Sequence, residues 1–414
     1  MTPAPPTPGP ASGTVTLAYI EAARVRIADT IRATPLFEKQ VLTQRFGVPV
    51  FVKDEHLQRT GSFKIRGAMN LISQLDPAEL ARGVVAASAG NHAQGVAVAA
   101  SVHGVQATIF MPADATLSKV EATRGYGAEV VLSGENLSEA LEAAKAHAAA
   151  TGAIFVHPFD DARIVAGQGT LGLELVEQLP DIATVILPIG GGGLFAGVAT
   201  AIRALRPHCR IVGVQAEACQ SIRAARAAGH PVTIDAAPTM ADGIAVKQPG
   251  ALTYPIIEAT IDELVMVDDN ELASAMLWLM ERAKQVVEGA GAATMAALLA
   301  GKIAPVGPTV CVLSGGNIDP MALIPVIRHG LTNAGRFLRI ATILPDRPGE
   351  LSRLLTQLAR LRVNVLAIEH RREGEPLLHV GDTRIDLTLQ TRNSNHVVEV
   401  LADLRSAGYD VRER

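Results

Sequence analysis

Cysteine and aromatic residues are scarce in this chain of 414 residues. Its three cysteines, Cys209, Cys219 and Cys311, are scattered and form no C-x-x-C pair. This spacing argues against a disulfide framework or a cysteine-based metal site, and it is typical of a reduced, cytoplasmic protein. Aromatic residues make up 3% of the chain, which leaves few side chains for stacking on the bases of single-stranded nucleic acid.

An excess of one charge and long apolar runs are also missing. The chain has 37 basic and 41 acidic side chains, well mixed, with a net charge of -4, so nothing favours nucleic acid or an anionic membrane as a partner. No uncharged apolar run reaches the roughly 18 residues of a membrane-spanning helix. Residues 1–13 are mostly Pro, Thr, Ala and Gly, without the basic start and apolar core of a secretory signal, and they predict a disordered tail.

Glycine and aliphatic residues are abundant, and they follow a regular pattern. Short apolar segments such as Val84–Ala87, Ala107–Met111 and Val185–Pro188 alternate with amphipathic stretches of helical length. Buried strands that alternate with helices predict an α/β fold with a mostly parallel sheet covered on both faces. We expect this core to extend over residues 14–328.

The pattern changes towards the C-terminus. Residues 329–335 contain Gly330, Asn333 and Gly335 and are predicted to be a linker. The order of elements predicted for residues 336–414 is β-α-β-β-α-β, which is the ferredoxin-like arrangement. The first helix of this tail carries leucines that fall on one face; they are Leu351, Leu354, Leu355, Leu358 and Leu361.

One lysine lies in an unusual local sequence. Lys64 stands in the segment Gly-Ser-Phe-Lys-Ile-Arg-Gly-Ala, residues 61–68, just after a predicted strand. Most lysines are solvated surface charges, but small neighbours let the backbone approach a flat ligand, and Phe63 offers a ring. A lysine held in such a pocket loses its proton more readily and becomes a nucleophile that can form an imine.

Three further motifs follow strands. The first, Ser-Ala-Gly-Asn-His at residues 88–92, opens a helix whose N-terminus can bind an anion; read alone, it is more simply a helix cap with a packed histidine. The second, Gly190–Gly193 followed by Leu194, forms a nest for a phosphate. It also fits a dinucleotide fingerprint, with Glu217 placed to bind a ribose. The third is Ser-Gly-Gly-Asn at residues 314–317, in which the serine otherwise only caps a turn.

Taken in this order, the four motifs resemble those of fold-type II pyridoxal-phosphate (PLP) enzymes of the serine/threonine dehydratase family, and threonine ammonia-lyases (threonine dehydratases) match best. The tail resembles a single ACT domain. The resemblance implies a two-domain core like that of the tryptophan synthase β subunit, with a smaller subdomain at about residues 60–157. It also implies PLP bound as a Schiff base to Lys64, the catalytic residue.

The resemblance assigns further site residues. The cofactor-binding residues that it implies are Phe63, Lys64, Asn91, Gly190, Gly191, Gly192, Gly193, Leu194, Glu288, Ser314 and Gly315. The substrate carboxylate is assigned to Ser88, Ala89, Gly90, Asn91 and His92. In this family Ser314 hydrogen-bonds the pyridine nitrogen of PLP, and a neutral partner there favours β-elimination over transamination.

Two departures from relatives narrow the interpretation. Racemases of this group carry a serine where this chain has Ala89, and alanine cannot move a proton. Relatives that bind a divalent cation begin that site with an acid matching Glu217 and end it with an acid where this chain has Arg223. We therefore expect no divalent metal site, although a monovalent ion held by carbonyls stays open.

The expected reaction is deamination of L-threonine to 2-oxobutanoate and ammonia, and also of L-serine to pyruvate. The alternatives left open are a serine dehydratase or serine racemase-like enzyme, an amino-acid-binding regulator without catalysis, and an NAD-dependent oxidoreductase. In the tail, a candidate effector turn comprises Asp346, Pro348, Gly349, Glu350 and Leu351; the equal alternative is a dimerisation module without ligand. The family implies a homodimer or homotetramer.

Overall fold

The computed structural model describes residues 14–372 and 379–413, and it divides the chain into two compact units, Met1–Asp319 and Pro320–Arg414. The predicted disordered tail, residues 1–13, lies outside the described residues. The boundary between the units falls before the linker predicted at residues 329–335. Most of that predicted linker is instead the end of helix α14 (Pro320–Asn333).

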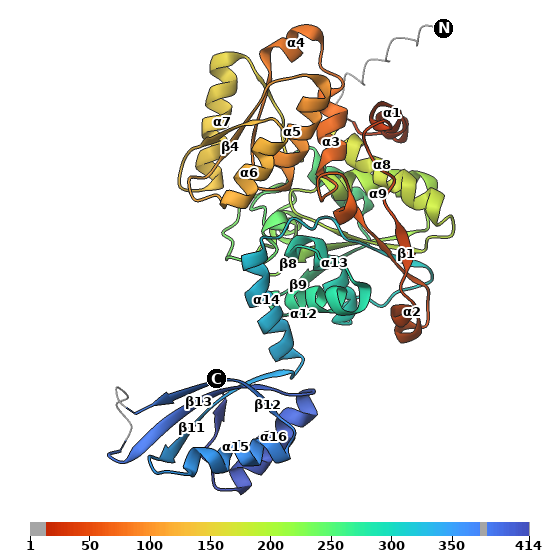
Figure 1. Cartoon of the computed structure of the whole chain (residues 1–414). Coiled ribbons are helices and arrows are strands. Elements are labelled where there is room, and N and C mark those ends of the chain that lie inside the picture. Colours follow the sequence, from red (N-terminus) through yellow and green to blue (C-terminus); the bar gives the residue numbers. More distant parts are fainter. Residues whose placement is uncertain (1–13, 373–378, 414) are drawn as a thin grey trace. The chain divides into compact units, whose positions relative to one another are not determined.

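The first unit contains a six-stranded sheet (Figure 1). Its order is β1 (Leu36–Glu38), β2 (Val50–Lys53), β10 (Thr309–Val312), β7 (Thr184–Pro188), β8 (Arg210–Ala216) and β9 (Glu263–Val267). All neighbours are parallel except β1, which pairs antiparallel with β2. Because β2, β10 and β7 are adjacent and parallel, the segments that follow them emerge at one edge of the sheet. Lys64, Ser314 and Gly190 all lie in these segments.

A second, four-stranded sheet completes this unit. Its order is β5 (Glu129–Leu132), β4 (Ala107–Met111), β3 (Val84–Ala87) and β6 (Ile154–Phe155), and all pairs are parallel. The alternating pattern therefore forms one fully parallel sheet and one that is parallel except for β1, which confirms the α/β prediction. The Asn91 motif follows β3, so it belongs to this smaller sheet, as expected for a subdomain near residues 60–157.

Helices cover both sheets (Figure 1). They are α1 (Leu17–Ile27), α2 (Gln40–Phe46), α3 (Lys64–Ile72), α4 (Pro77–Arg82), α5 (Asn91–His103), α6 (Leu117–Gly125), α7 (Leu137–Thr151), α8 (Ala162–Gln178), α9 (Gly193–Leu205), α10 (Ser221–Ala228), α11 (Thr253–Thr260), α12 (Asp269–Trp278) and α13 (Gly289–Leu299). Short helical turns occur at Glu55–Leu57, Asp242–Ile244 and Leu279–Ala283. Helix α3 packs against α5 of the smaller sheet and against α8, and α8 packs against α9. None of these described helices is long and apolar enough to span a bilayer.

Helix α8 is longer than its sequence predicts. The apolar pattern indicates a start at Gly169, but the helix begins at Ala162, where the carboxylate of Asp161 accepts the backbone N–H of Arg163 at 2.8 Å. Its internal glycines are contact points: a Cβ on Gly167 would lie 2.5 Å from the carbonyl oxygen of Arg66, and one on Gly169 2.9 Å from that of Gly197. Close packing of three helices thus outweighs the low helix propensity of glycine.

A buried ionic cluster fixes α3 to its neighbours. The guanidinium of Arg66 binds Glu55 at 2.7 and 2.8 Å and Glu174 of α8 at 2.6 Å. Lys53 of β2 binds the other oxygen of Glu174 at 2.8 Å. Lys53, Glu55 and Arg66 are fully buried, and the two cations balance the two carboxylates. The cluster therefore holds the helix that begins with Lys64 in a fixed position.

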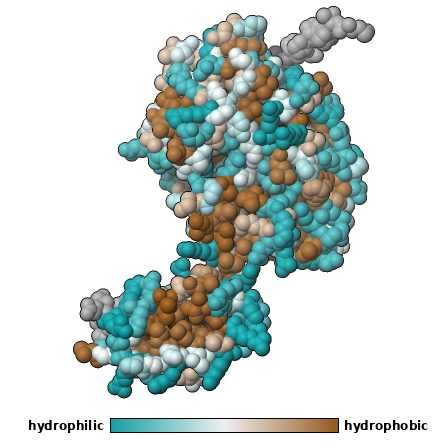
Figure 2. Space-filling view, viewed as in Figure 1, coloured by the Kyte–Doolittle hydropathy of each residue, from teal (hydrophilic) through white to brown (hydrophobic). Residues whose placement is uncertain are grey.

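The second unit is an α+β fold. Besides α14 it contains β11 (Phe337–Pro345), α15 (Glu350–Arg360), β12 (Asn364–Arg371), β13 (Asp382–Gln390), α16 (Ser394–Ser406) and β14 (Arg412–Glu413). The sheet order β12-β13-β11-β14 with antiparallel neighbours confirms the ferredoxin-like prediction. The last strand, β14, has only 2 residues. Figure 2 shows a hydrophobic patch on this unit, and the exposed apolar residues of β12 include Leu366 and Ile368.

Candidate active site

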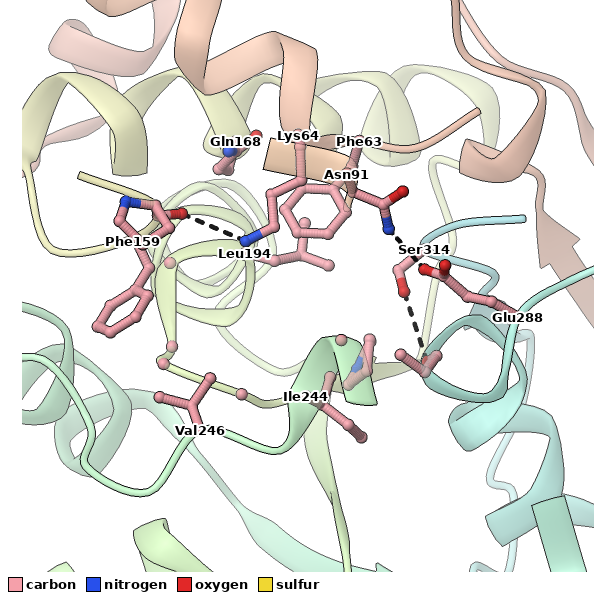
Figure 3. Close-up of a pocket in the computed structure, with 18 residues that line it drawn as sticks. Phe63, Lys64, Asn91, Phe159, Gln168, Leu194, Ile244, Val246, Glu288 and Ser314 are labelled. Atoms are coloured by element: carbon pink, nitrogen blue, oxygen red, sulfur yellow. Dashed lines mark hydrogen bonds between the residues drawn. The ribbon is translucent and has the colours of Figure 1, made fainter. Parts of the chain in front are cut away.

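The four sequence motifs converge on one cavity of the first unit (Figure 3). It encloses about 550 Å³ of space, part of it open to solvent. The lining residues are Phe63, Lys64, Asn91, Pro158, Phe159, Gln168, Pro188, Gly190, Gly191, Gly192, Gly193, Leu194, Gly243, Ile244, Val246, Glu288, Ala290 and Ser314. Motifs more than two hundred residues apart in the sequence thus face the same space.

Lys64 is the first residue of α3, and its side chain reaches into the cavity. The Nζ atom donates to the backbone carbonyl of Pro158 at 3.3 Å and lies 5.4 Å from the centre of the Phe63 ring. Burial lowers the pKa of Lys64 to about 8, and the nearby carboxylate of Glu288 only partly offsets this effect. A substantial fraction of the amine is therefore neutral near physiological pH and can act as a nucleophile or a base.

The glycine loop, residues 190–193, closes another wall of the cavity. A Cβ on Gly191 would lie 2.4 Å from the ring of Phe159, and Gly192 has a φ of +99°, which disfavours other residues. Within the described chain, the backbone N–H groups of Gly190, Gly191 and Gly192 donate no hydrogen bond. Free N–H groups at the start of a helix form an anion site, as the sequence predicts.

Asn91, Glu288 and Ser314 lie together on a third side (Figure 3). Asn91 Nδ2 donates to Glu288 Oε1 at 2.6 Å. Burial, together with the charge of Asp242, raises the pKa of Glu288 to about 7. The hydroxyl of Ser314 is buried, and its hydrogen bond to the carbonyl of Ala290 is long, at 3.5 Å, so a ligand atom in the cavity can compete for this donor.

Gly315 lies behind this wall and does not line the cavity. A Cβ at this position would lie 2.3 Å from Glu288 Oε1. The glycine therefore makes room for the carboxylate of Glu288. A direct cofactor contact for Gly315, which the resemblance implies, stays a prediction.

The segment assigned to the substrate carboxylate is only partly at the cavity. Asn91 lines it, whereas Ser88, Ala89, Gly90 and His92 do not. The ring of His92 is buried, and its Nε2 atom bonds to the carbonyl of Val156 at 2.8 Å. Burial, together with the charge of Lys64, lowers the pKa of His92 to about 3. The imidazole is thus neutral and packed, and only the backbone of His92 remains for an anion.

Several lining residues were missed by the sequence analysis. Pro158 and Phe159 follow β6, and Gly243, Ile244 and Val246 lie in a loop between α10 and α11. Both segments contain aspartates, Asp160, Asp161 and Asp242, but neither has a run of glycines such as that at residues 190–193. Gln168, in the middle of α8, accepts the N–H of Gly67 at 3.2 Å, and its only sequence signal is a polar residue on an apolar helix face.

The dinucleotide interpretation does not agree with this geometry. Glu217 is exposed and does not line the cavity, although its proposed partners Gly191 and Gly193 do. Among the described residues, no group of three or more His, Cys, Asp or Glu side chains is arranged to hold a metal ion. Arg223, in place of the expected acid, bonds to Gln220 at 3.0 Å.

Comparison with known proteins assigns the family. The model of a family described as pyridoxal-phosphate dependent enzyme matches residues 27–315. The chain belongs to this family. An L-threonine ammonia-lyase of Geobacter sulfurreducens is 48% identical over 391 residues, which cover 94% of this chain and 97% of the relative. Because 391 residues exceed the length of the first unit, this similarity extends into the second.

Solved structures of the family share the fold of the first unit. The structure of the processed form of threonine deaminase isoform 2 from Solanum lycopersicum has a TM-score of 0.72 at 35% identity and covers 78% of this chain and 95% of that one. The structure of maize serine racemase also has a TM-score of 0.72 at 35% identity, covering 77% and 98%.

The cavity fits the family's cofactor, pyridoxal phosphate. The glycine loop leaves no space for side chains and presents unpaired N–H groups, which suits the phosphate. Lys64 supplies the amine for covalent attachment. The hydroxyl of Ser314 and the amide of Asn91 are hydrogen-bonding groups for the polar atoms of a ring placed beside them. Each chemical group of the cofactor thus has a matching residue.

Proposed function

We propose that this protein is a PLP-dependent lyase that deaminates L-threonine to 2-oxobutanoate and ammonia, and also L-serine to pyruvate. The observation that carries the proposal is the amine of Lys64, with its lowered pKa, in one cavity with the glycine loop and Ser314. The similarity to an L-threonine ammonia-lyase over nearly the whole of both chains supports this substrate class.

Lys64 has two tasks in this reaction. Its ε-amine would hold the cofactor covalently, and the same amine, when free, would accept the proton from the substrate Cα. When bound, the cofactor supplies the electron sink that makes this proton acidic enough to remove. The lowered pKa of Lys64 keeps the amine able to accept a proton near neutral pH. Ala89 carries no acid or base, so proton transfer is confined to one face of the substrate.

The remaining residues position the reactants. Ser314 would give the ring nitrogen of the cofactor a neutral partner, and a neutral partner favours loss of the β-hydroxyl over transamination. Asn91, on the same side of the cavity, would offer its side-chain amide to the ring. The N-terminus of α5, at residues 91–92, has the backbone N–H groups to hold the substrate carboxylate, which places the reacting Cα near Lys64.

The test is direct. Purified protein is mixed with L-threonine, D-threonine or L-serine, and 2-oxobutanoate, pyruvate and ammonia are measured together with the absorbance of the bound cofactor. We expect 2-oxobutanoate and an equal amount of ammonia from L-threonine and none from D-threonine. A spectrum that responds to threonine without any product would instead support an amino-acid-binding regulator.

A serine racemase-like activity is the second candidate, because the maize enzyme is among the similar structures. The discriminating residue is Ala89, where racemases carry a serine. Chiral chromatography of L-serine reactions should show pyruvate without D-serine for the parent protein. The A89S variant should form measurable D-serine; D-serine from the parent would favour the racemase interpretation.

For the second unit we propose binding of a small amino acid at the turn of residues 346–351. Gly349 has a φ of +97°, and a Cβ added to it would meet no atom within 4 Å, so the N-terminus of α15 is open to a carboxylate. Asp346 is held there by Arg372 at 3.1 Å. An added effector should change threonine turnover in the parent and less so in G349A. Gly408 has a similar φ of +93° in open space, so G408A is the matched control.

We propose a cytoplasmic homodimer or homotetramer as the working assembly. Size-exclusion chromatography with light scattering, at concentrations used for the assay, measures this directly. A monomer with full activity would contradict the proposal.

A further inference from the structure

Helix α11 lies directly behind the glycine loop. Its first residue, Thr253, is fully buried, and its Oγ1 donates to the backbone carbonyl of Gly191 at 2.6 Å. The N–H of Gly250 donates to the same oxygen at 3.3 Å. Thr253 does not line the cavity, although Gly191 and Gly192 do, so this carbonyl is held from the side away from the cofactor.

The position of this carbonyl determines where the next N–H points. The carbonyl of Gly191 and the N–H of Gly192 belong to one peptide group, which is trans, and in a trans peptide the two point in opposite directions. A carbonyl directed at Thr253 therefore directs the Gly192 N–H towards the cavity. This N–H is one of those without a partner in the described chain.

The peptide groups of a glycine-rich loop keep one orientation only if neighbouring residues hold them by hydrogen bonds. Glycine populates both signs of φ with little energy difference, so rotation of the peptide between Gly191 and Gly192 costs less than it would between other residues. Rotation would turn the carbonyl oxygen towards the phosphate and the N–H away from it. The hydroxyl of Thr253 opposes this rotation because the carbonyl would lose a short hydrogen bond in a buried place.

Asp160 fixes Thr253 in turn. Its carboxylate accepts the N–H groups of Ala251 at 3.0 Å, Leu252 at 2.9 Å and Thr253 at 3.3 Å. The preceding residue, Phe159, packs on the opposite side of the loop against Gly191. The loop is thus clamped between Phe159 and α11, and Asp160 joins the two sides of the clamp.

We propose that Thr253 is a positioning residue for the cofactor's phosphate: through the carbonyl of Gly191 it keeps the Gly192 N–H directed at the phosphate before the cofactor arrives. This inference rests on cofactor binding, which the family shares, and not on threonine as the substrate. Its test requires no turnover, so its failure and the failure of the proposed reaction are separate results.

The experiment compares two probes on the cofactor-free protein. Dissociation constants are measured by absorbance for pyridoxal phosphate and for pyridoxal, which has the same ring and aldehyde but no phosphate. The variants are T253V, which keeps the shape but loses the donor, T253S, which restores it, and T260V as the control. Thr260 belongs to the same helix, but its hydroxyl bonds only to carbonyls of α11 itself, at 2.6 and 3.5 Å.

We expect T253V to weaken pyridoxal phosphate binding about tenfold or more and pyridoxal binding by less than about twofold. T253S should return to within about threefold of the parent, and T260V should bind both probes like the parent. Equal weakening of both probes would mean a general structural role and would overturn the proposal, as would no weakening at all. If circular dichroism shows that T253V is unfolded, T253A and D160N take its place. Each should weaken the binding of pyridoxal phosphate more than that of pyridoxal.

Discussion

Asn317 holds the amide of Asn91 in one orientation. Its Nδ2 donates to Asn91 Oδ1 and to the backbone carbonyl of Thr60, both at 2.7 Å. Since the Asn91 oxygen accepts this bond, its nitrogen faces Glu288, to which it donates at 2.6 Å. A row of hydrogen bonds therefore links the turn before Lys64 to the side of the cavity that carries Asn91 and Glu288. The position of Asn317 also requires glycine at residue 61, because a Cβ there would lie 2.3 Å from Asn317 Oδ1.

We predict that N317D changes the cofactor environment without touching the cofactor. The carboxylate has the shape of the amide but cannot donate to Asn91 or Thr60, so Asn91 loses its fixed orientation. We expect kcat/KM for L-threonine to fall about tenfold or more and the pH titration of the bound cofactor's absorbance to shift.

The matched control for this prediction is N70D. Asn70 is fully buried, whereas Asn317 is partly buried, and like Asn317 it donates from Nδ2 to a backbone carbonyl, that of Arg163 at 2.7 Å. In the described chain its hydrogen bonds do not reach Asn91. Its variant should lose stability and keep the parent's cofactor titration. If both variants shift the titration equally, Asn317 has no specific role in orienting Asn91.

Lys64 should be required for turnover and dispensable for folding. Its Nζ makes one hydrogen bond, to Pro158 at 3.3 Å, and its removal relieves the cost of a buried amine. We expect K64A to lower kcat by about 10⁴-fold and to lose the absorbance of the covalently attached cofactor. Urea unfolding of the cofactor-free variant should match or exceed that of the parent. Retention of full activity would rule out Lys64 as the base.

Glu288 should make the stability of the cofactor-free protein depend on pH. Burial raises its pKa from an ordinary value of 4.5 to about 7, so between these values the folded state binds more protons than the unfolded state. The free energy of unfolding then falls as the pH rises through this window, by on the order of 3 kcal/mol at most. Lys64, whose pKa is about 8, titrates above this range.

The variant E288Q isolates this contribution, because other buried groups such as Asp54, with a pKa raised to about 6 by burial, remain in both proteins. Urea unfolding is measured at pH 5 and pH 8 for parent and variant. The difference between the two pH values should be smaller in E288Q. Equal differences would show that Glu288 is ionised in the folded protein throughout this range.

Much of the site could be predicted from sequence because its chemistry is concentrated in short motifs. Lys64, Asn91, the glycine loop and Ser314 each stand at the junction of a strand and a helix, where the local pattern is strong, and the structure places all of them at one cavity. Thr253 and Asn317, which position site residues without lining the cavity, could not be predicted in this way. Thr253 bonds to Gly191, 62 positions away, and Asn317 bonds to Asn91, 226 positions away. Nothing in the neighbouring sequence indicates either contact.

Three helices, α4, α11 and α14, have a proline in their first turn, where the sequence alone would suggest a break. Pro77 begins α4, Pro255 lies in the first turn of α11, and Pro320 begins α14. In a first helical turn the missing N–H has no intrahelical acceptor to lose, so these prolines start helices, although proline more often indicates a break. Helix α14 also contains an internal proline, Pro325. Because an internal proline usually breaks a helix, the sequence predicts a linker at residues 329–335 where the helix continues.

The buried ionic cluster around Arg66 should contribute strongly to stability. Replacing Arg66 by methionine leaves the carboxylates of Glu55 and Glu174 with only Lys53 as a counter-ion, in a place that is largely buried. We expect R66M to lower the free energy of unfolding by about 3–5 kcal/mol, measured by urea denaturation of the cofactor-free protein at neutral pH.

The control uses the same helix. Arg24 pairs with Glu177, one turn along α8 from Glu174, but 45% and 60% of these two side chains are exposed. Because water and salt screen such a pair, R24M should cost less than about 1 kcal/mol. If R66M costs no more than R24M, the cluster does not hold α3, and the position of Lys64 must depend on the apolar packing of α3 against α5 and α8. That outcome would also predict that R66M keeps the parent's affinity for pyridoxal phosphate, whereas a destabilised α3 should weaken it.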